Sequence, residues 1–181
     1  MRRVVSGVLA AGWLLAWGLA GVGTGAAATP PRGHVALGVD GRVISTALTP
    51  AQALADLKMF LLFKPRLPGH VPAGMTLQSV NVTTFGGSPA YSAVSFDYAG
   101  PGQRAFSLRE GKLHLSTSVS GGTVTAMAVG KAPGQLTEVR KGKVAVLLAL
   151  SWFAGIGYDL HTLGTATRLT AKDLLTIARA V

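Results

Sequence analysis

Apolar and polar residues alternate through the middle of the chain. In residues 91–99, "YSAVSFDYA", the apolar residues Val94, Phe96 and Tyr98 fall at every second position and share one face. Residues 75–85, "MTLQSVNVTTF", also read as a strand. A period of two residues is typical of a strand with one buried face. The pattern therefore predicts two successive strands here.

Further strands are predicted after residue 103, joined by turns that contain glycine. Residues 104–119 indicate a hairpin around Glu110-Gly111. Its apolar positions are Phe106, Leu108, Leu113 and Leu115. Residues 123–130 predict another strand, and two later turns are expected at Lys141-Gly142 and near Ala154-Gly155. Short strands at this spacing, separated by glycine turns, predict an antiparallel meander.

The longest apolar run of this region extends from Val144 to Tyr158. Fifteen helical residues would reach only about 22 Å, whereas the hydrocarbon core of a bilayer is roughly 30 Å thick. Gly155 and Gly157 interrupt the run as well. We therefore expect a central strand of the sheet rather than a membrane span.

A helix is predicted to begin after Thr49. Thr49 is a favourable N-cap, Pro50 suits the first helical position, and Gln52 completes a capping-box spacing. The helix is expected to run to Phe63, because Pro65 cannot continue it. Its last turn is apolar nearly all round, which predicts that it is buried there, across the sheet.

A second helix is predicted at the end of the chain. Thr170 and Asp173 fit a capping box. The apolar positions that follow share one helical face: Leu174, Ile177, Ala178 and Val181. The expected fold class is therefore α+β, an antiparallel β-meander with one helix before it and a C-terminal helix packed on it.

The segment between the first helix and the first long strand, residues 64–80, contains three prolines and two glycines. Such a stretch predicts a rigid corner from helix to sheet, with an architectural role. Residues 29–48, before the helix, are expected to be flexible. Within them, Asp40-Gly41 is a favoured pair for a type I′ turn, so a small hairpin is an alternative.

The first 28 residues have the three-part layout of a secretory signal peptide. Arg2 and Arg3 precede an apolar stretch, which ends in Ala26-Ala27-Ala28, a suitable cleavage site. The alternative is an uncleaved anchor, because the run from Val4 to Val22 approaches the roughly 20 residues that a spanning helix needs. We divide the chain into a signal peptide (1–28), a flexible N-terminal segment (29–48) and a single α+β domain (49–181).

Export determines which partners the chain would meet. The chain has no cysteine, which excludes disulfides, cysteine nucleophiles, thiolate metal sites and a lipid-anchored N-terminus. Its formal charge is +10 from 17 basic and 7 acidic residues, and +8 once Arg2 and Arg3 leave with the signal. A basic extracytoplasmic protein meets anionic lipid head groups and wall polymers rather than nucleic acid.

Several short segments occur in a distinctive order: "LPGHVPAGM" (67–75), "VSFDY" (94–98), the run in which Trp152 precedes Tyr158, and "LLTIARAV" (174–181). This order resembles the bacterial domain-of-unknown-function family 4367. The resemblance covers roughly Phe60 to Val181. It implies an exported or membrane-tethered protein, in some members anti-sigma-factor-like or sporulation-associated. It implies no catalytic residue.

Motifs for catalysis or metal binding are weak. The four histidines, His34, His70, His114 and His161, show no spacing that is typical of a local zinc site. The seven acidic residues are scattered singly. Asp97 and Asp159 lie in strand-like segments next to tyrosines, and they are expected to pair with arginine unless the fold assembles them into a site. We expect no catalytic residue, no cofactor and no metal.

The densest positive charge lies in the predicted turn "VRKGKV". Arg140, Lys141 and Lys143 are candidates for contact with an anionic envelope surface. The alternative is a solvated hairpin tip.

The sequence favours an exported, non-enzymatic binding or regulatory module of the bacterial cell envelope. Its partner would be an envelope protein, an anionic envelope polymer or a membrane surface. One alternative is a carrier of a lipid-like ligand, which an internal apolar pocket beneath the first helix would favour. Another is an envelope hydrolase, which a cleft joining a histidine to an acid would favour.

Overall fold

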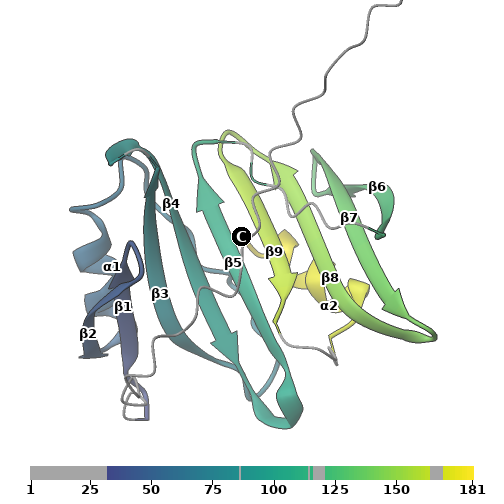
Figure 1. Ribbon diagram of the computed structural model, residues 1–181, viewed down its shortest axis with the longest axis horizontal. Helices are drawn as coiled ribbons and strands as arrows, with labels where there is room; N and C mark the ends of the chain where they lie inside the picture. Colours follow the sequence, from purple (N-terminus) through teal and green to yellow (C-terminus); the bar gives the residue numbers. More distant parts are fainter. Residues whose placement is uncertain (1–31, 86, 114, 116–120, 164–168) are drawn as a thin grey trace, which may run out of the picture.

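The computed structural model describes residues 32–85, 87–113, 115, 121–163 and 169–181. Within these ranges the chain forms one nine-stranded sheet, ordered β2-β1-β3-β4-β5-β9-β8-β7-β6 (Figure 1). The strands are β1 (Val35–Val39), β2 (Arg42–Leu48), β3 (Thr76–Phe85), β4 (Ser88–Ala99), β5 (Ala105–Gly111), β6 (Thr123–Val129), β7 (Ala132–Lys141), β8 (Val144–Phe153) and β9 (Gly157–Thr162). The helical elements are α1 (Pro50–Leu57), α2 (Ala171–Arg179) and the short 3₁₀ turn η1 (Pro101–Gln103). An open mixed sheet with two α-helices confirms the α+β class.

The predicted topology is wrong in two respects. β1 pairs with β3 in parallel, whereas the other neighbouring pairs are antiparallel. In addition, β9 lies between β5 and β8, so the strands do not follow one another in chain order as a meander requires. Alternation within a strand shows which face is buried, but it does not specify which distant strand lies alongside.

The segment 29–48, which we predicted to be flexible, contains two strands of the sheet. β1 and β2 form the hairpin that the alternative interpretation placed at Asp40-Gly41, and both turn residues have positive φ, 48° and 79°. The Asp40 carboxylate accepts hydrogen bonds from the backbone N–H and the hydroxyl of Thr84, at 2.7 and 2.6 Å. The sheet thus begins before Thr49, and α1 follows two strands instead of preceding the sheet.

The predicted hairpin around Glu110-Gly111 is also absent. β5 pairs with β4 on one side and with β9 on the other, in both cases as far as Gly111. Because both sides of β5 are occupied, the residues after Gly111 cannot pair back on it. The predicted central strand is confirmed as β8, which lies between β7 and β9. Turns at Gly142 and Gly155, where φ is positive, precede and follow it.

Helix α1 begins as predicted but ends earlier. The Thr49 hydroxyl accepts from the N–H of Gln52, and the Gln52 side chain accepts from the N–H of Thr49, at 3.3 and 2.8 Å. The helix ends at Leu57, six residues before the predicted end at Phe63. Apolar residues on all sides of a continued helix could not all face the sheet. The chain instead unwinds, which buries Leu61 and leaves Leu62 exposed.

Helix α2 confirms the prediction for the end of the chain. Thr170 and Asp173 form the capping box, with the Asp173 carboxylate accepting from the N–H of Thr170 at 2.8 Å. Leu174, Ile177 and Ala178 are buried against the sheet. Across the described ranges, neither helix combines the length and the apolar character that crossing a membrane would require.

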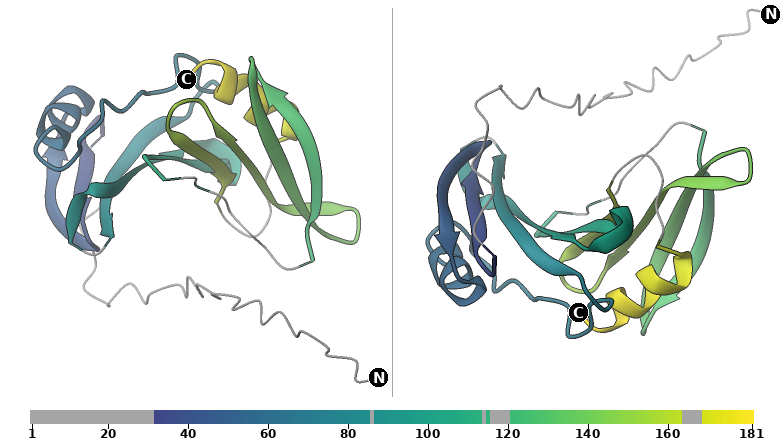
Figure 2. Two further views of the ribbon diagram at one scale, coloured as in Figure 1. Left: turned by 90° about the horizontal axis from the view of Figure 1, so that it is seen from above. Right: turned by 90° about the horizontal axis from the view of Figure 1, so that it is seen from below.

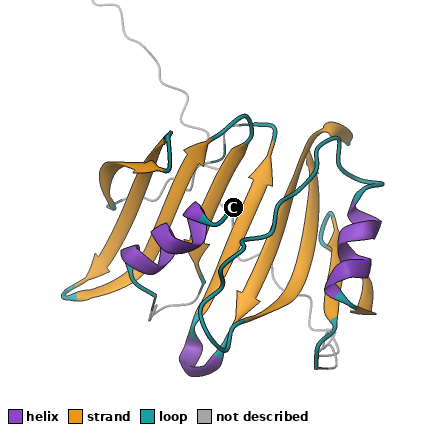
Figure 3. Cartoon of the chain, turned by 180° about the vertical axis from the view of Figure 1, so that it is seen from behind, coloured by secondary structure: helices purple, strands orange, loops and turns teal. Residues whose placement is uncertain are grey.

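The sheet is bent into an arch, and both helices lie on its outer side (Figure 2). Seen from behind, α1, α2 and the segment that joins α1 to β3 all lie in front of the sheet (Figure 3). We call this side the convex face and the opposite side the concave face. The core lies between the convex face and these covering segments, which meet where the N–H of Gly69 donates to the carbonyl of Ala180 at 2.7 Å.

Candidate functional site

The concave face carries two rows of polar side chains that cross the strands in register. These polar rows arise because successive residues of a strand point to opposite faces of the sheet. Phe96, Leu108 and Leu160 are buried on the convex face, so their neighbours along each strand point to the concave face. The first row, from β3 to β7, is Ser79, Asp97, Ser107, His161, Ala149 and Thr137. The second is Asn81, Ser95, Arg109, Asp159, Ser151 and Gln135. Ala149 is the one apolar member.

Asp97 is held in place by its neighbours on β3. Its Oδ2 accepts from the Ser79 hydroxyl at 2.6 Å and from the Asn81 amide at 3.0 Å. The Asn81 amide also donates to the Ser79 oxygen at 3.2 Å. These three side chains are half-buried. The Asp97 carboxylate is therefore a fixed acceptor on an accessible part of the concave face, and it has polar partners where we predicted an arginine.

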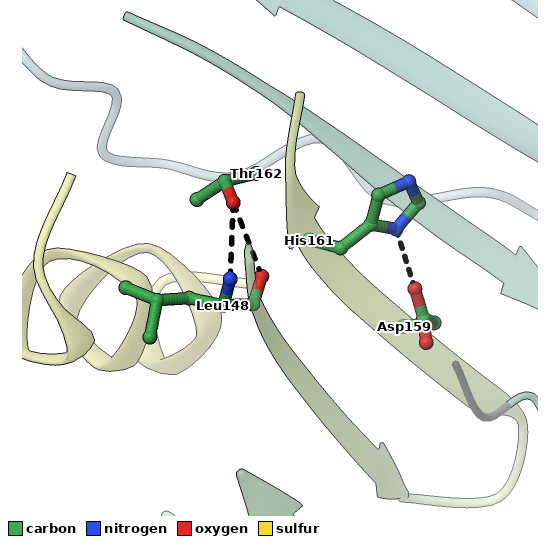
Figure 4. Close-up of polar contacts among 4 residues, drawn as sticks. All are labelled: Leu148, Asp159, His161 and Thr162. Carbon is green, nitrogen blue, oxygen red and sulfur yellow. Dashed lines mark hydrogen bonds and ion pairs between the residues drawn. The ribbon is translucent and has the colours of Figure 1, made fainter. Parts of the chain in front are cut away.

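Asp159 and His161 form the second fixed group. They lie two residues apart on β9, and His161 Nδ1 is 2.6 Å from Asp159 Oδ1 (Figure 4). The Asp159 side chain is 0% exposed and that of His161 is 19% exposed. Because the carboxylate is bonded to Nδ1, His161 Nε2 lies on the far side of the ring from it. Arg109 of β5 stands opposite Asp159 in the register, as the predicted pairing with arginine requires.

Thr162 fixes the neighbouring end of β9 to β8 on the opposite face. Its hydroxyl oxygen accepts from the N–H of Leu148 at 3.1 Å and lies 3.5 Å from the Leu148 carbonyl (Figure 4). The position of His161 is thus set by a bond on each side of the strand.

The fold joins a histidine to an acid, and among the described residues the hydroxyl that stands opposite this pair is buried. Ser107 is the cross-strand neighbour of His161, yet only 3% of it is exposed. Asp97 and Asp159 are separated by β5, about two strand spacings or roughly 10 Å, so they do not form a carboxylate pair. A nucleophile must be reached by substrate. The described side chains of this face offer hydrogen-bond donors, hydrogen-bond acceptors and charge.

One end of the polar rows is covered by the chain that follows β5. Gly111 and Gly157 are paired there, and Leu115 packs against this pair. A β-carbon on Gly157 would collide with the carbonyl oxygen of Leu113 and lie 2.8 Å from the N–H nitrogen of Leu115. Glycine at position 157 therefore lets the chain fold back over the concave face.

The convex face contains a buried carboxylate that sequence reasoning had placed in a turn. Glu110 is 0% exposed, and its two oxygens lie 3.2 and 2.9 Å from the donating N–H nitrogen of Arg66. Burial raises the pKa of Glu110 to about 7, and the nearby Arg66 opposes the shift. The Tyr98 and Tyr158 rings lie near it, and burial together with the Glu110 charge raises the pKa of Tyr98 to about 12. This carboxylate anchors the segment that joins α1 to β3.

The predicted basic residues lie where the sequence placed them, at the turn between β7 and β8. Arg140 donates to the Glu138 carboxylate at 2.8 Å and to the Lys143 carbonyl at 3.2 Å. Lys141 and Lys143 are exposed. With Arg140 paired, the turn presents two uncompensated charges, and it lies apart from the polar rows.

The three described histidines lie apart from one another. His34 immediately precedes β1, His70 is exposed in the segment before β3, and His161 faces the concave side. His114 lies outside the described residues. Within the described part of the chain, no three of the residues His, Cys, Asp and Glu are placed to hold a metal ion.

The polar rows could be predicted from the sequence only if the order of the strands in the sheet were known. The local signal is present, since "SFDY", "FSLRE" and "YDLHT" each alternate polar and apolar residues. Their assembly depends on β9 pairing with β5, which brings residues 107 and 161 together. The alternation therefore indicates that these polar residues lie on the face opposite the apolar core, without showing that they share one surface or that four of them, Ser107, Thr137, Ser151 and Asp159, are buried.

Comparison with known proteins identified no relative of the chain. No family model matches the chain, and neither the curated proteins nor the solved structures contain a match. The resemblance to the domain-of-unknown-function family 4367 thus stays a prediction from short segments of the sequence.

Proposed function

We propose that the chain is an exported, non-enzymatic binding module of the bacterial cell envelope that holds a hydrophilic segment of an envelope protein on its concave face. The observation that carries the proposal is the pair of polar rows, which cross six neighbouring strands on the face that neither helix covers. Export is inferred from the leader-like residues 1–28, which lie outside the described structure.

Two groups of side chains in these rows are held in place by hydrogen bonds within the sheet. Asp97 is fixed by Ser79 and Asn81, and His161 is fixed by Asp159. Side chains already held in one rotamer lose less entropy on binding, so each hydrogen bond to a ligand contributes more. Strands lie about 4.8 Å apart, so an extended polar chain lying across them would meet accessible polar side chains on β3, β4, β5, β9 and β7. The row members on β8, Ala149 and Ser151, are buried.

The alternatives receive less support. A lipid carrier needs an apolar pocket beneath α1, but Ala53 and Leu57 fill that space and are 0% exposed. The groove beside α1 lies on the outside of the helix end and is open to solvent. A hydrolase needs a nucleophile beside His161, and Ser107 is covered. A regulatory role in stress or sporulation signalling fits the binding proposal, and identifying the partner would test it.

Site-specific photo-crosslinking tests the proposal. A benzoyl-phenylalanine placed at Ser95, two residues from Asp97 on β4, is expected to give one discrete adduct with an envelope protein in cells of the native bacterium. The same probe at Thr176, exposed on α2, is the matched control and is expected not to give that adduct. No adduct from Ser95, or the same adduct from both positions, would contradict the proposal.

A further inference from the structure

A second surface is formed by the turn that follows α1. Residues 58–64, "KMFLLFK", begin and end with an exposed lysine, and we call them the lysine-flanked turn. Between the lysines, Met59 is 75% exposed and Leu62 is 60% exposed. Large apolar side chains at such exposure are unfavourable in water, and a cluster of them marks an interaction surface.

The exposure of these side chains is built into the fold. The N–H of Phe60 donates to the carbonyl of Leu57 at 3.0 Å, and Leu61 is buried in the core. At the other end, the N–H of Arg66 is bonded to the buried Glu110. With both ends fixed and Leu61 directed inward, Met59 and Leu62 point outward.

The charge around the turn is predominantly positive. Lys58, Lys64 and Arg66 are exposed, Asp56 before the turn is half-buried, and no acidic residue occurs from Leu57 to Phe96. A groove of about 570 Å³ lies beside the turn and is lined by Leu54, Phe63 and other apolar residues, together with the two lysines. Apolar side chains between cations are the combination that enters the head-group region of a bilayer containing anionic lipid.

We propose that the lysine-flanked turn docks the protein on an anionic phospholipid bilayer, with Met59 and Leu62 entering the interface and Lys58 and Lys64 contacting phosphates. α1 lies at one end of the molecule in all views, so a flat surface can reach this turn (Figures 1 and 2). The concave face opens in another direction in Figure 2 and stays accessible. The turn between β7 and β8 also has two free lysines, but it carries no comparable pair of apolar side chains between them. Docking here is independent of the ligand on the concave face.

The absence of cysteine allows a direct test on the full chain. Leu62→Cys introduces a single thiol that can be labelled with the environment-sensitive fluorophore NBD. On addition of equimolar phosphatidylglycerol and phosphatidylcholine vesicles, the emission is expected to shift to the blue and increase. The same label at Val124→Cys is the control, because Val124 is similarly exposed at 59% and lies on β6, the edge strand at the opposite end of the sheet from α1. The control is expected not to shift, even if residues 1–28 tether the chain to the vesicle.

The charge requirement is tested in the labelled protein. Lys58→Gln with Lys64→Gln should weaken partitioning of the turn roughly 25-fold, about fivefold for each lysine. Lys141→Gln with Lys143→Gln removes the same charge from the other turn and should leave the Leu62 signal unchanged. Equal signals from positions 62 and 124, an equal response to pure phosphatidylcholine vesicles, or a loss caused only by the second pair of substitutions would overturn the proposal.

Discussion

Glu110→Gln is expected to stabilise the protein by up to about 3 kcal/mol near pH 8 and to leave its stability almost unchanged near pH 4.5. Glu110 is fully buried, and burial raises its pKa from 4.5 to about 7. The glutamine amide has nearly the same shape, and its oxygen can still accept the hydrogen bond from Arg66. The substitution therefore removes the ionisation and keeps the anchor.

The sign follows from the two pKa values. Below pH 4.5, Glu110 is protonated in both the folded and the unfolded chain, so it adds no pH dependence. Between pH 4.5 and about 7 the unfolded chain releases this proton while the folded chain retains it, so the free energy of unfolding falls as the pH rises. Above about pH 7 both forms are ionised and the difference is constant.

Urea denaturation at several pH values measures this contribution. The difference in unfolding free energy between Glu110→Gln and the wild type should grow from near zero at pH 4.5 to its full value above pH 7. Glu138→Gln is the control, because Glu138 is partly exposed beside Arg140 and should show no comparable trend. The same pH dependence in the Glu110→Gln variant and the wild type would show that Glu110 is not the buried acid described here.

His161→Ala is expected to destabilise the protein by about 3 kcal/mol, because it removes a partner from a fully buried carboxylate. In a background that carries Asp159→Asn, the same substitution should cost only about 1 kcal/mol, since the lost hydrogen bond is then between neutral groups. The expected coupling between positions 159 and 161 is thus roughly 2 kcal/mol.

The coupling requires four proteins: the wild type, the two single variants and the double variant. Their unfolding free energies are measured by urea denaturation at about pH 7. A cost of His161→Ala that is the same in both backgrounds, within about 0.5 kcal/mol, would mean that the 2.6 Å contact contributes no specific stability.

Features that depend on neighbouring residues were predicted well. Both capping boxes follow from residue types three apart in sequence. The turn at Asp40-Gly41, where only a few residue types tolerate positive φ, was the alternative to a flexible segment. The strand β4 follows from alternation, and β8 follows from a long apolar run interrupted by glycine. In each case the structure is determined by interactions within the segment itself.

Features that depend on distant partners were not predicted. Glu110-Gly111 looks like a turn by composition, yet Tyr158 of β9 stands opposite Glu110, so the strand continues. α1 was predicted too long because the burial of residues 58–63 depends on how many of them the sheet can cover. The polar rows were missed for the same reason, since their members come from strands far apart in sequence. The candidate site exists because the order of the strands brings these residues together.

The central claim is that the concave polar rows bind a partner protein. The most direct test is the affinity of the protein cross-linked through Ser95, measured by isothermal titration calorimetry with wild-type chain and with Asp97→Asn. Asp97 is half-buried and its neighbours can still bond an amide oxygen, so the variant should fold normally. Loss of its charge should weaken binding about tenfold, equivalent to about 1.4 kcal/mol, whereas Glu138→Gln should not. Equal affinity of the wild type and Asp97→Asn would contradict the account.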